Sequence, residues 1–137
     1  MAKNQNEIKT EDNKNKDKEI EFPIEVKAYL NAIHDEEKKE DVLFFLNYMR
    51  LNHPEIIPVI SYGIPMYKLE GKQRYVAFSN ASNHYTFHST DFDIIDELRS
   101  KIKGSGKGKG SVQLKYGMDE YRDLIIEAIE TIVKRKI

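Results

Sequence analysis

Cysteine is absent from this chain of 137 residues. Without cysteine the protein can form no disulfide framework, no thiolate nucleophile and no zinc site with cysteine ligands. The absence favours a reducing compartment, and we expect a cytoplasmic protein.

Long apolar runs and an excess of charge of one sign are also missing. The longest apolar stretch, residues 42–46, is far shorter than the roughly 20 residues that a membrane-spanning helix needs. The N-terminus lacks the apolar segment of a signal peptide, so we expect neither targeting nor a membrane anchor. Lysine and arginine total 22 against 23 acidic residues, so the whole chain has no field that would attract nucleic acid. Any charged site must therefore be local.

Catalytic motifs are not recognisable either. The serines lie in no nucleophile-elbow pattern, and no acid–base pair can be identified from spacing. We therefore expect a protein that is not an enzyme.

Residues 1–21 contain few apolar side chains, namely Met1, Ala2, Ile8 and Ile20. Such a segment cannot bury enough surface to order itself, so we expect a disordered, charged N-terminal tail. The remaining residues, 22–137, suffice for one domain and leave no room for a second.

Helical periodicity predicts four helices. A short one follows Phe22, and a second begins after His34-Asp35 and ends near Asn52, before the proline at position 54. A third extends from Thr90 or Asp91 to about residue 103, and a terminal helix opens at Met118 or Asp119.

Extended runs at residues 66–69, 74–79 and 84–88 alternate in polarity and are rich in Tyr, Val, Phe and Thr. Short turns separate them, which indicates an antiparallel meander, and residues 111–115 add a further strand. The order of elements predicts an α+β fold in which an antiparallel sheet carries helices packed on one face.

Several motifs together resemble the YdhG-like family of small bacterial proteins. They are Tyr-Gly-Ile-Pro-Met-Tyr at 62–67 with Gly-Lys at 71–72, Val-Ala-Phe at 76–78, His-Tyr-Thr-Phe-His at 84–88 and Gly-Lys-Gly-Ser-Val-Gln-Leu at 108–114. The resemblance covers roughly residues 24–135. The chain departs from the family pattern at 116–119, where a Pro-Leu-Pro entry to the last helix is common, and at 80–83, where a lysine is often found.

This resemblance implies a frataxin-like fold and a role as an intracellular iron chaperone. Iron carried as cargo would be held weakly by exposed oxygen ligands. Glu36, Glu37, Glu40 and Asp41 lie at i, i+1, i+4 and i+5 of the second predicted helix, so they form two adjacent carboxylate rows. We take them, with His34 just before the helix, as the candidate iron ligands. The alternative is an ordinary solvated helix face, partly paired with lysines.

Other candidate sites have ordinary explanations. Asp91, Asp93, Asp96 and Glu97 form a second acidic group, where acids also serve as helix caps. His84 and His88 share a strand face, but about 13 Å separates them, so they cannot bind one ion together. The glycine run at 104–110 lacks the context of a phosphate-binding Walker loop and is better explained as a flexible connection, although its lysines could touch an acidic partner.

The expected cargo is Fe²⁺ or Fe³⁺, the expected partners are iron–sulfur or haem assembly proteins, and the expected state is a monomer or weak dimer. Two alternatives remain open. The chain could be an interaction module that docks a partner through its sheet or acidic helix, or a small-molecule binder that uses the Tyr-rich strands.

Overall fold

The computed structural model describes residues 22–135. The predicted tail at 1–21 lies outside the described residues. The helices and strands follow in the order α2 (Ile24–Asn31), α3 (Glu36–Asn52), β1 (Val59–Ser61), β2 (Ile64–Lys68), β3 (Tyr75–Asn80), β4 (His84–Ser89), α4 (Phe92–Lys101), β5 (Ser111–Lys115), a 3₁₀ turn η2 (Asp119–Tyr121) and α5 (Arg122–Lys134). The predicted α+β class is confirmed.

All five strands form one antiparallel sheet in the order β1-β2-β3-β4-β5. Each strand pairs with its neighbour in sequence. Short connections join β1 through β4 as antiparallel hairpins, whereas α4 and the glycine-rich loop lie between β4 and β5. Side chains alternate across each strand, so one row of residues faces the helices and the other faces away.

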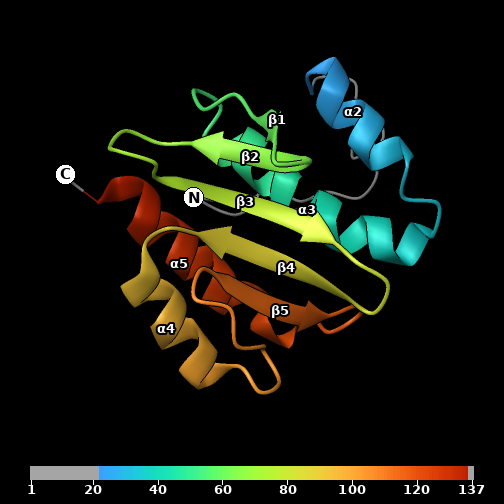
Figure 1. Ribbon diagram of the computed structural model, residues 1–137. Coiled ribbons are helices and arrows are strands. Elements are labelled where there is room, and N and C mark those ends of the chain that lie inside the picture. Colours follow the sequence, from blue (N-terminus) through green and yellow to red (C-terminus); the bar gives the residue numbers. More distant parts are fainter. Residues whose placement is uncertain (1–21, 136–137) are drawn as a thin grey trace, which may run out of the picture.

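The helices pack against one face of the sheet. Figure 1 shows α3 and α5 behind the strands, with α4 beside β5 and α2 near β1, and no helix of residues 22–135 crosses in front. We call the side that carries no helix of residues 22–135 the open face. It carries Met66, Lys68, Tyr75, Ala77, Ser79, His84, Thr86, His88 and Gln113. The covered side holds the core, in which Phe45 of α3 stacks on Phe78 of β3 with ring centroids 5.4 Å apart. Ile125, Ile129 and Ile132 of α5 are fully buried in the same cluster.

Strand β1 was not among the predicted strands. It has three residues and follows Pro58, so it is too short to show a period-two pattern. In the sequence, Gly63 and Pro65 predict a turn over residues 62–65, since glycine permits positive φ and proline restrains the backbone. Tyr62 and Gly63 do connect β1 to β2, with φ of 53° and 78°. Positive φ at both central residues is typical of the type I′ hairpin turn, whose twist matches that of the strands. Ile64 and Pro65, assigned to the same predicted turn, belong to β2.

The starts of α3 and α4 lie where the sequence predicted them, but only α3 has a side-chain cap. The Asp35 carboxylate accepts hydrogen bonds from the backbone N–H groups of Glu37 and Lys38, as an N-cap should. Asp91 occupies the N-cap position of α4, but its side chain makes no capping bond because two arginines occupy it. Within residues 22–135, no helix is both long enough and apolar enough to cross a membrane.

Candidate functional site

The start of α3 presents the carboxylates that the sequence singled out. Glu36, Glu37 and Glu40 are exposed, and none of them forms an ion pair within residues 22–135. The partial pairing with lysines that the alternative included is therefore not found for these three side chains, whereas their exposure fits both a solvated helix face and a cation-holding surface. His34 is also exposed and precedes the helix cap.

Asp41 differs from the expectation of an exposed ligand. Its side chain is 4 % exposed, and its Oδ1 lies 2.9 Å from Nη2 of Arg122. Its Oδ2 accepts a hydrogen bond of 2.9 Å from the backbone N–H of Gly117. The Arg122 guanidinium also lies 4.0 Å from the centroid of the Phe44 ring. Asp41 therefore joins α3 to the connection before α5 and is not available as a ligand for solvent cations.

Position on the helix explains the difference among these acids. Asp41 is one turn beyond Glu37 and lies on the side of α3 that contacts Gly117 and Arg122, whereas Glu36 and Glu40 lie one turn apart on the exposed side. Within the described part of the chain, no three His, Asp or Glu side chains are arranged to enclose a metal ion.

The second acidic group is engaged in ion pairs. Asp91 and Asp93 pair with Arg135 at 3.0 and 2.8 Å, and Asp96 pairs with Arg99 at 3.3 Å. Glu97 pairs with Lys101 of the next turn at 3.4 Å. The hydrogen bonds from Arg135 hold the pKa of Asp93 below its ordinary value. This group serves the structure around α4.

The two histidines of β4 lie on the open face, as their alternation predicted. Nε2 of His88 lies 2.8 Å from Oγ of Ser79 on the neighbouring strand. Burial lowers the pKa of His88, because the charged imidazolium is poorly solvated there. Burial therefore favours the neutral form of the ring, which pairs with the Ser79 hydroxyl.

His53 forms a polar cluster that sequence reasoning missed. It is buried at the end of α3, and its Nε2 lies 2.6 Å from Oε2 of Glu130 on α5. The Tyr48 hydroxyl donates to the same oxygen, and Nζ of Lys134 lies 3.2 Å from Oε1. From the sequence, His53 before Pro54 is expected to be a turn residue, and its partner in the structure lies 77 residues away. The cluster ties the end of α3 to α5.

Because of this cluster, we expect the free energy of unfolding to depend on pH. Burial alone would raise the pKa of Glu130, but hydrogen bonds from Tyr48, His53 and Lys134 outweigh it and hold the pKa below the ordinary 4.5. A carboxylate with a lowered folded-state pKa stabilises the protein above its unfolded pKa, and this contribution disappears as the pH falls through the folded value. We expect Glu130→Gln to lower the free energy of unfolding at neutral pH, and this effect to shrink as the pH falls below about 4.5 and through the lower folded-state pKa.

Urea denaturation of both proteins across this pH range measures the difference. Glu127→Gln, an exposed change one turn earlier, is the control and should show no such convergence. A stability difference that stays constant to about pH 3 would contradict the assignment of the charge to Glu130.

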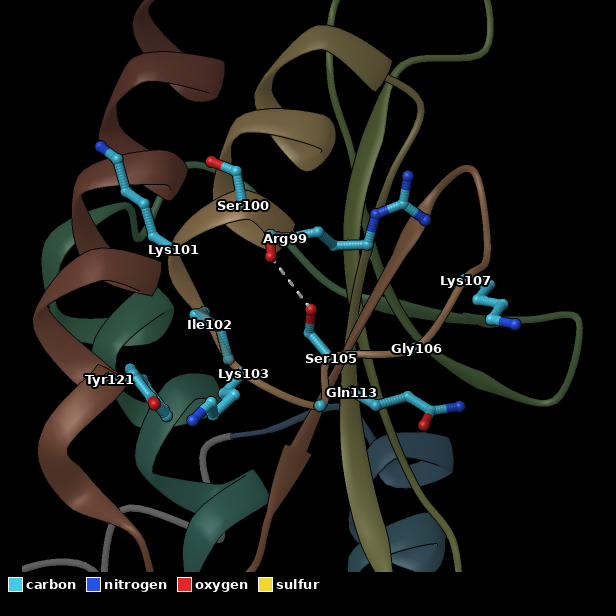
Figure 2. Close-up of a pocket in the computed structure, with 11 residues that line it drawn as sticks. Arg99, Ser100, Lys101, Ile102, Lys103, Ser105, Gly106, Lys107, Gln113 and Tyr121 are labelled. Atoms are coloured by element: carbon cyan, nitrogen blue, oxygen red, sulfur yellow. Dashed lines mark hydrogen bonds between the residues drawn. The ribbon is translucent and has the colours of Figure 1, made fainter.

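A cation-rich hollow lies at the end of α4 (Figure 2). Its volume is about 770 Å³, and it is lined by residues 99–107, Gln113 and Tyr121. Figure 2 shows Lys101 and Lys107 on opposite sides of the hollow and Lys103 next to Tyr121. The cations surround the hollow and do not converge on one point, which fits a broad acidic surface better than a single small anion.

The glycine-rich loop of this hollow makes hydrogen bonds to both neighbouring elements. The Gln113 N–H of β5 donates to the carbonyl of Ser105 at 2.9 Å, and the Arg99 guanidinium of α4 donates to the carbonyl of Gly108. Gly104 and Gly106 have φ of 71° and 88°, conformations that favour glycine. The loop therefore covers the outer edge of β5 as well as connecting α4 to it.

The fold of this chain is found in a protein of known structure. The structure is similar to a solved structure of a DUF1801 family protein, YdhG from Bacillus subtilis, with a TM-score of 0.65 and 18 % sequence identity. The match covers 80 % of this chain and 89 % of that protein. The sequence matches no protein-family model, and no curated protein is significantly similar to it. The chain thus has the fold of YdhG.

Proposed function

We propose that this protein is a non-enzymatic iron carrier that holds Fe²⁺ or Fe³⁺ weakly at the exposed start of α3. The observation that supports the proposal is the set of exposed carboxylates Glu36, Glu37 and Glu40, which have no ion-pair partner within residues 22–135. The frataxin-like arrangement implied by the sequence motifs belongs to the same proposal, as does delivery to iron–sulfur or haem assembly proteins.

The chemistry of the helix start suits cargo better than a resident metal. Glu36 and Glu40 lie one helical turn apart, close enough for two carboxylates to share a hydrated cation. Hard oxygen ligands and open coordination positions hold iron loosely, and His34 can add a nitrogen ligand from the preceding loop. An acceptor protein can then complete the coordination shell and withdraw the ion.

Iron binding is expected to depend on these side chains. The double variant Glu36→Gln/Glu40→Gln should lose most of its affinity for Fe²⁺, roughly tenfold or more, because neutral amides cannot offset the ion's charge. Anaerobic isothermal titration calorimetry of the full chain with Fe²⁺ measures the change.

The matched control is Glu120→Gln/Glu127→Gln, which removes two exposed carboxylates near and on α5. It should bind iron as the unmodified protein does. The proposal is wrong if the unmodified protein takes up no iron at micromolar concentration, or if both double variants bind alike.

A second candidate function rests on the basic segment, residues 99–118. It contains Arg99, Lys101, Lys103, Lys107, Lys109 and Lys115 and no acidic residue, although the whole chain is nearly neutral. Lys103, Lys107 and Lys115 are exposed and form no ion pair within the described residues. A clustered positive field is complementary to an acidic protein surface. We propose that this segment binds an acidic partner protein. It would do so either in a protein that serves only as an interaction module and binds no metal, or as the docking site through which the iron carrier meets its acceptor.

The salt dependence of partner binding distinguishes a charge-driven interaction from one that buries apolar surface. Binding of an acidic partner captured from cell extract should weaken as salt rises, and Lys103→Gln/Lys107→Gln should weaken it further. Retention of the partner by the double variant at physiological salt would count against the basic segment.

A further inference from the structure

The open face of the sheet contains a second hollow, of about 500 Å³, beside β2 and β3. Its lining includes Tyr62, Met66, Lys68, Gln73, Tyr75 and Thr90. Met66 is 3 % exposed and forms an apolar floor, whereas the Tyr62 side chain is 92 % exposed at the rim. The volume falls within the range that drug-sized ligands occupy. Tyr75 is half-buried here, while Tyr67 and Tyr85 point into the core.

Unusual backbone conformations occur at the same place. Within residues 22–135, the non-glycine residues with positive φ are Tyr62 and Gln73, at 53° and 59°, and both line this hollow. A left-handed conformation is unfavourable for a residue as bulky as tyrosine, and such residues gather at binding sites. The Thr90 hydroxyl donates 2.8 Å to the carbonyl of Gln73 and so supports one of the two turns. Asparagine or glycine would suit position 62 better for folding alone.

The charges of the hollow favour an anion. No aspartate or glutamate is among its lining residues, whereas Lys68 and Arg74 are. Hydrogen bonds of 3.0 and 2.9 Å from the Arg74 guanidinium to Asp91 offset the positive charge of Arg74, so Lys68 is the cation that a ligand would meet. Lys68 is exposed and forms no ion pair within the described residues, so its ammonium group is free to meet a ligand.

We propose that this hollow binds a small aromatic carboxylate. The aromatic ring lies on the Met66 floor against Tyr62 or Tyr75, since tyrosine faces favour offset or edge contacts with a second ring. The carboxylate meets Lys68. The site shares no residue with the start of α3 or the basic segment, so it is independent of the iron proposal.

Titration of the metal-free, isotope-labelled full chain with phenylacetate, followed by two-dimensional NMR, tests the site. Peaks of Tyr62, Met66 and Tyr75 should shift, and phenylacetamide, the neutral analogue, should bind more weakly. Tyr62→Asn should lower the affinity for phenylacetate about three- to tenfold without lowering the unfolding temperature, because asparagine tolerates positive φ.

Lys68→Met should weaken phenylacetate and leave phenylacetamide unchanged, whereas Lys72→Met should change neither. Lys72 is exposed in the connection between β2 and β3, four residues after Lys68, but it does not line the hollow. The proposal is overturned if millimolar phenylacetate shifts no peak of the open face, if the shifts centre on the basic segment, or if Tyr62→Asn binds like the unmodified protein.

Discussion

Replacement of Asp91 by Ala is expected to lower the free energy of unfolding by about 3–5 kcal/mol, because it leaves a partly buried arginine without its counter-charge. The Asp91 side chain is 4 % exposed. Its carboxylate accepts hydrogen bonds from Nε and Nη2 of Arg74 at 3.0 and 2.9 Å. Nη1 of Arg135 adds a third bond of 3.0 Å. Urea denaturation at neutral pH measures the loss.

The network explains why one carboxylate matters so much. Arg74 also donates 2.7 Å to the carbonyl of Ile132, so Asp91 connects the start of β3, the start of α4 and the end of α5. Asp96→Ala is the control, because its carboxylate is 81 % exposed and its ion pair is worth well under about 1 kcal/mol. Equal losses for the two variants would contradict the role of Asp91.

Replacement of Asp41 by Ala is expected to lower the free energy of unfolding by about 3 kcal/mol while leaving iron affinity unchanged. The change removes the buried partner of the partly buried Arg122, leaving it only the exposed Asp119 at 3.5 Å, and it removes the acceptor of the Gly117 N–H. Urea denaturation and anaerobic calorimetry of the same preparation give the two readouts.

Glu40→Gln provides the opposite expectation. Its exposed side chain should change stability by no more than about 0.5 kcal/mol, yet its loss should weaken iron binding. If Asp41→Ala weakened iron binding in a protein that remains folded, the buried ion pair would be part of the metal site and our assignment of ligands would be wrong.

Local patterns predicted most of the fold. The cap at Asp35, the stop before Pro54 and the strand at 111–115 each depend on neighbouring residues, and all are found as expected. Alternation along the strand also predicted that His84 and His88 share one face of β4. These features are local because hydrogen-bonding side chains, prolines and alternation act over a few residues.

Local patterns did not predict the role of a side chain whose partner is distant in the sequence. Asp35 and Asp41 are both acids of one helical segment, but only contact with Arg122, 81 residues away in sequence, makes Asp41 a buried structural group. His53 likewise owes its role to Glu130 of α5. Helical spacing places a side chain on a face, and it does not indicate what packs against that face.

Taken by itself, the sequence determined the α+β class, the antiparallel meander and the position of the exposed acids at the start of α3, since periodicity and capping are properties of short segments. Tertiary structure alone decided which charges are free. It paired Asp41 and Asp91 with arginines, left Glu36, Glu37 and Glu40 exposed, and formed the open-face hollow from two separate turns. Burial and ion pairing depend on how distant segments meet, and no local pattern contains that information.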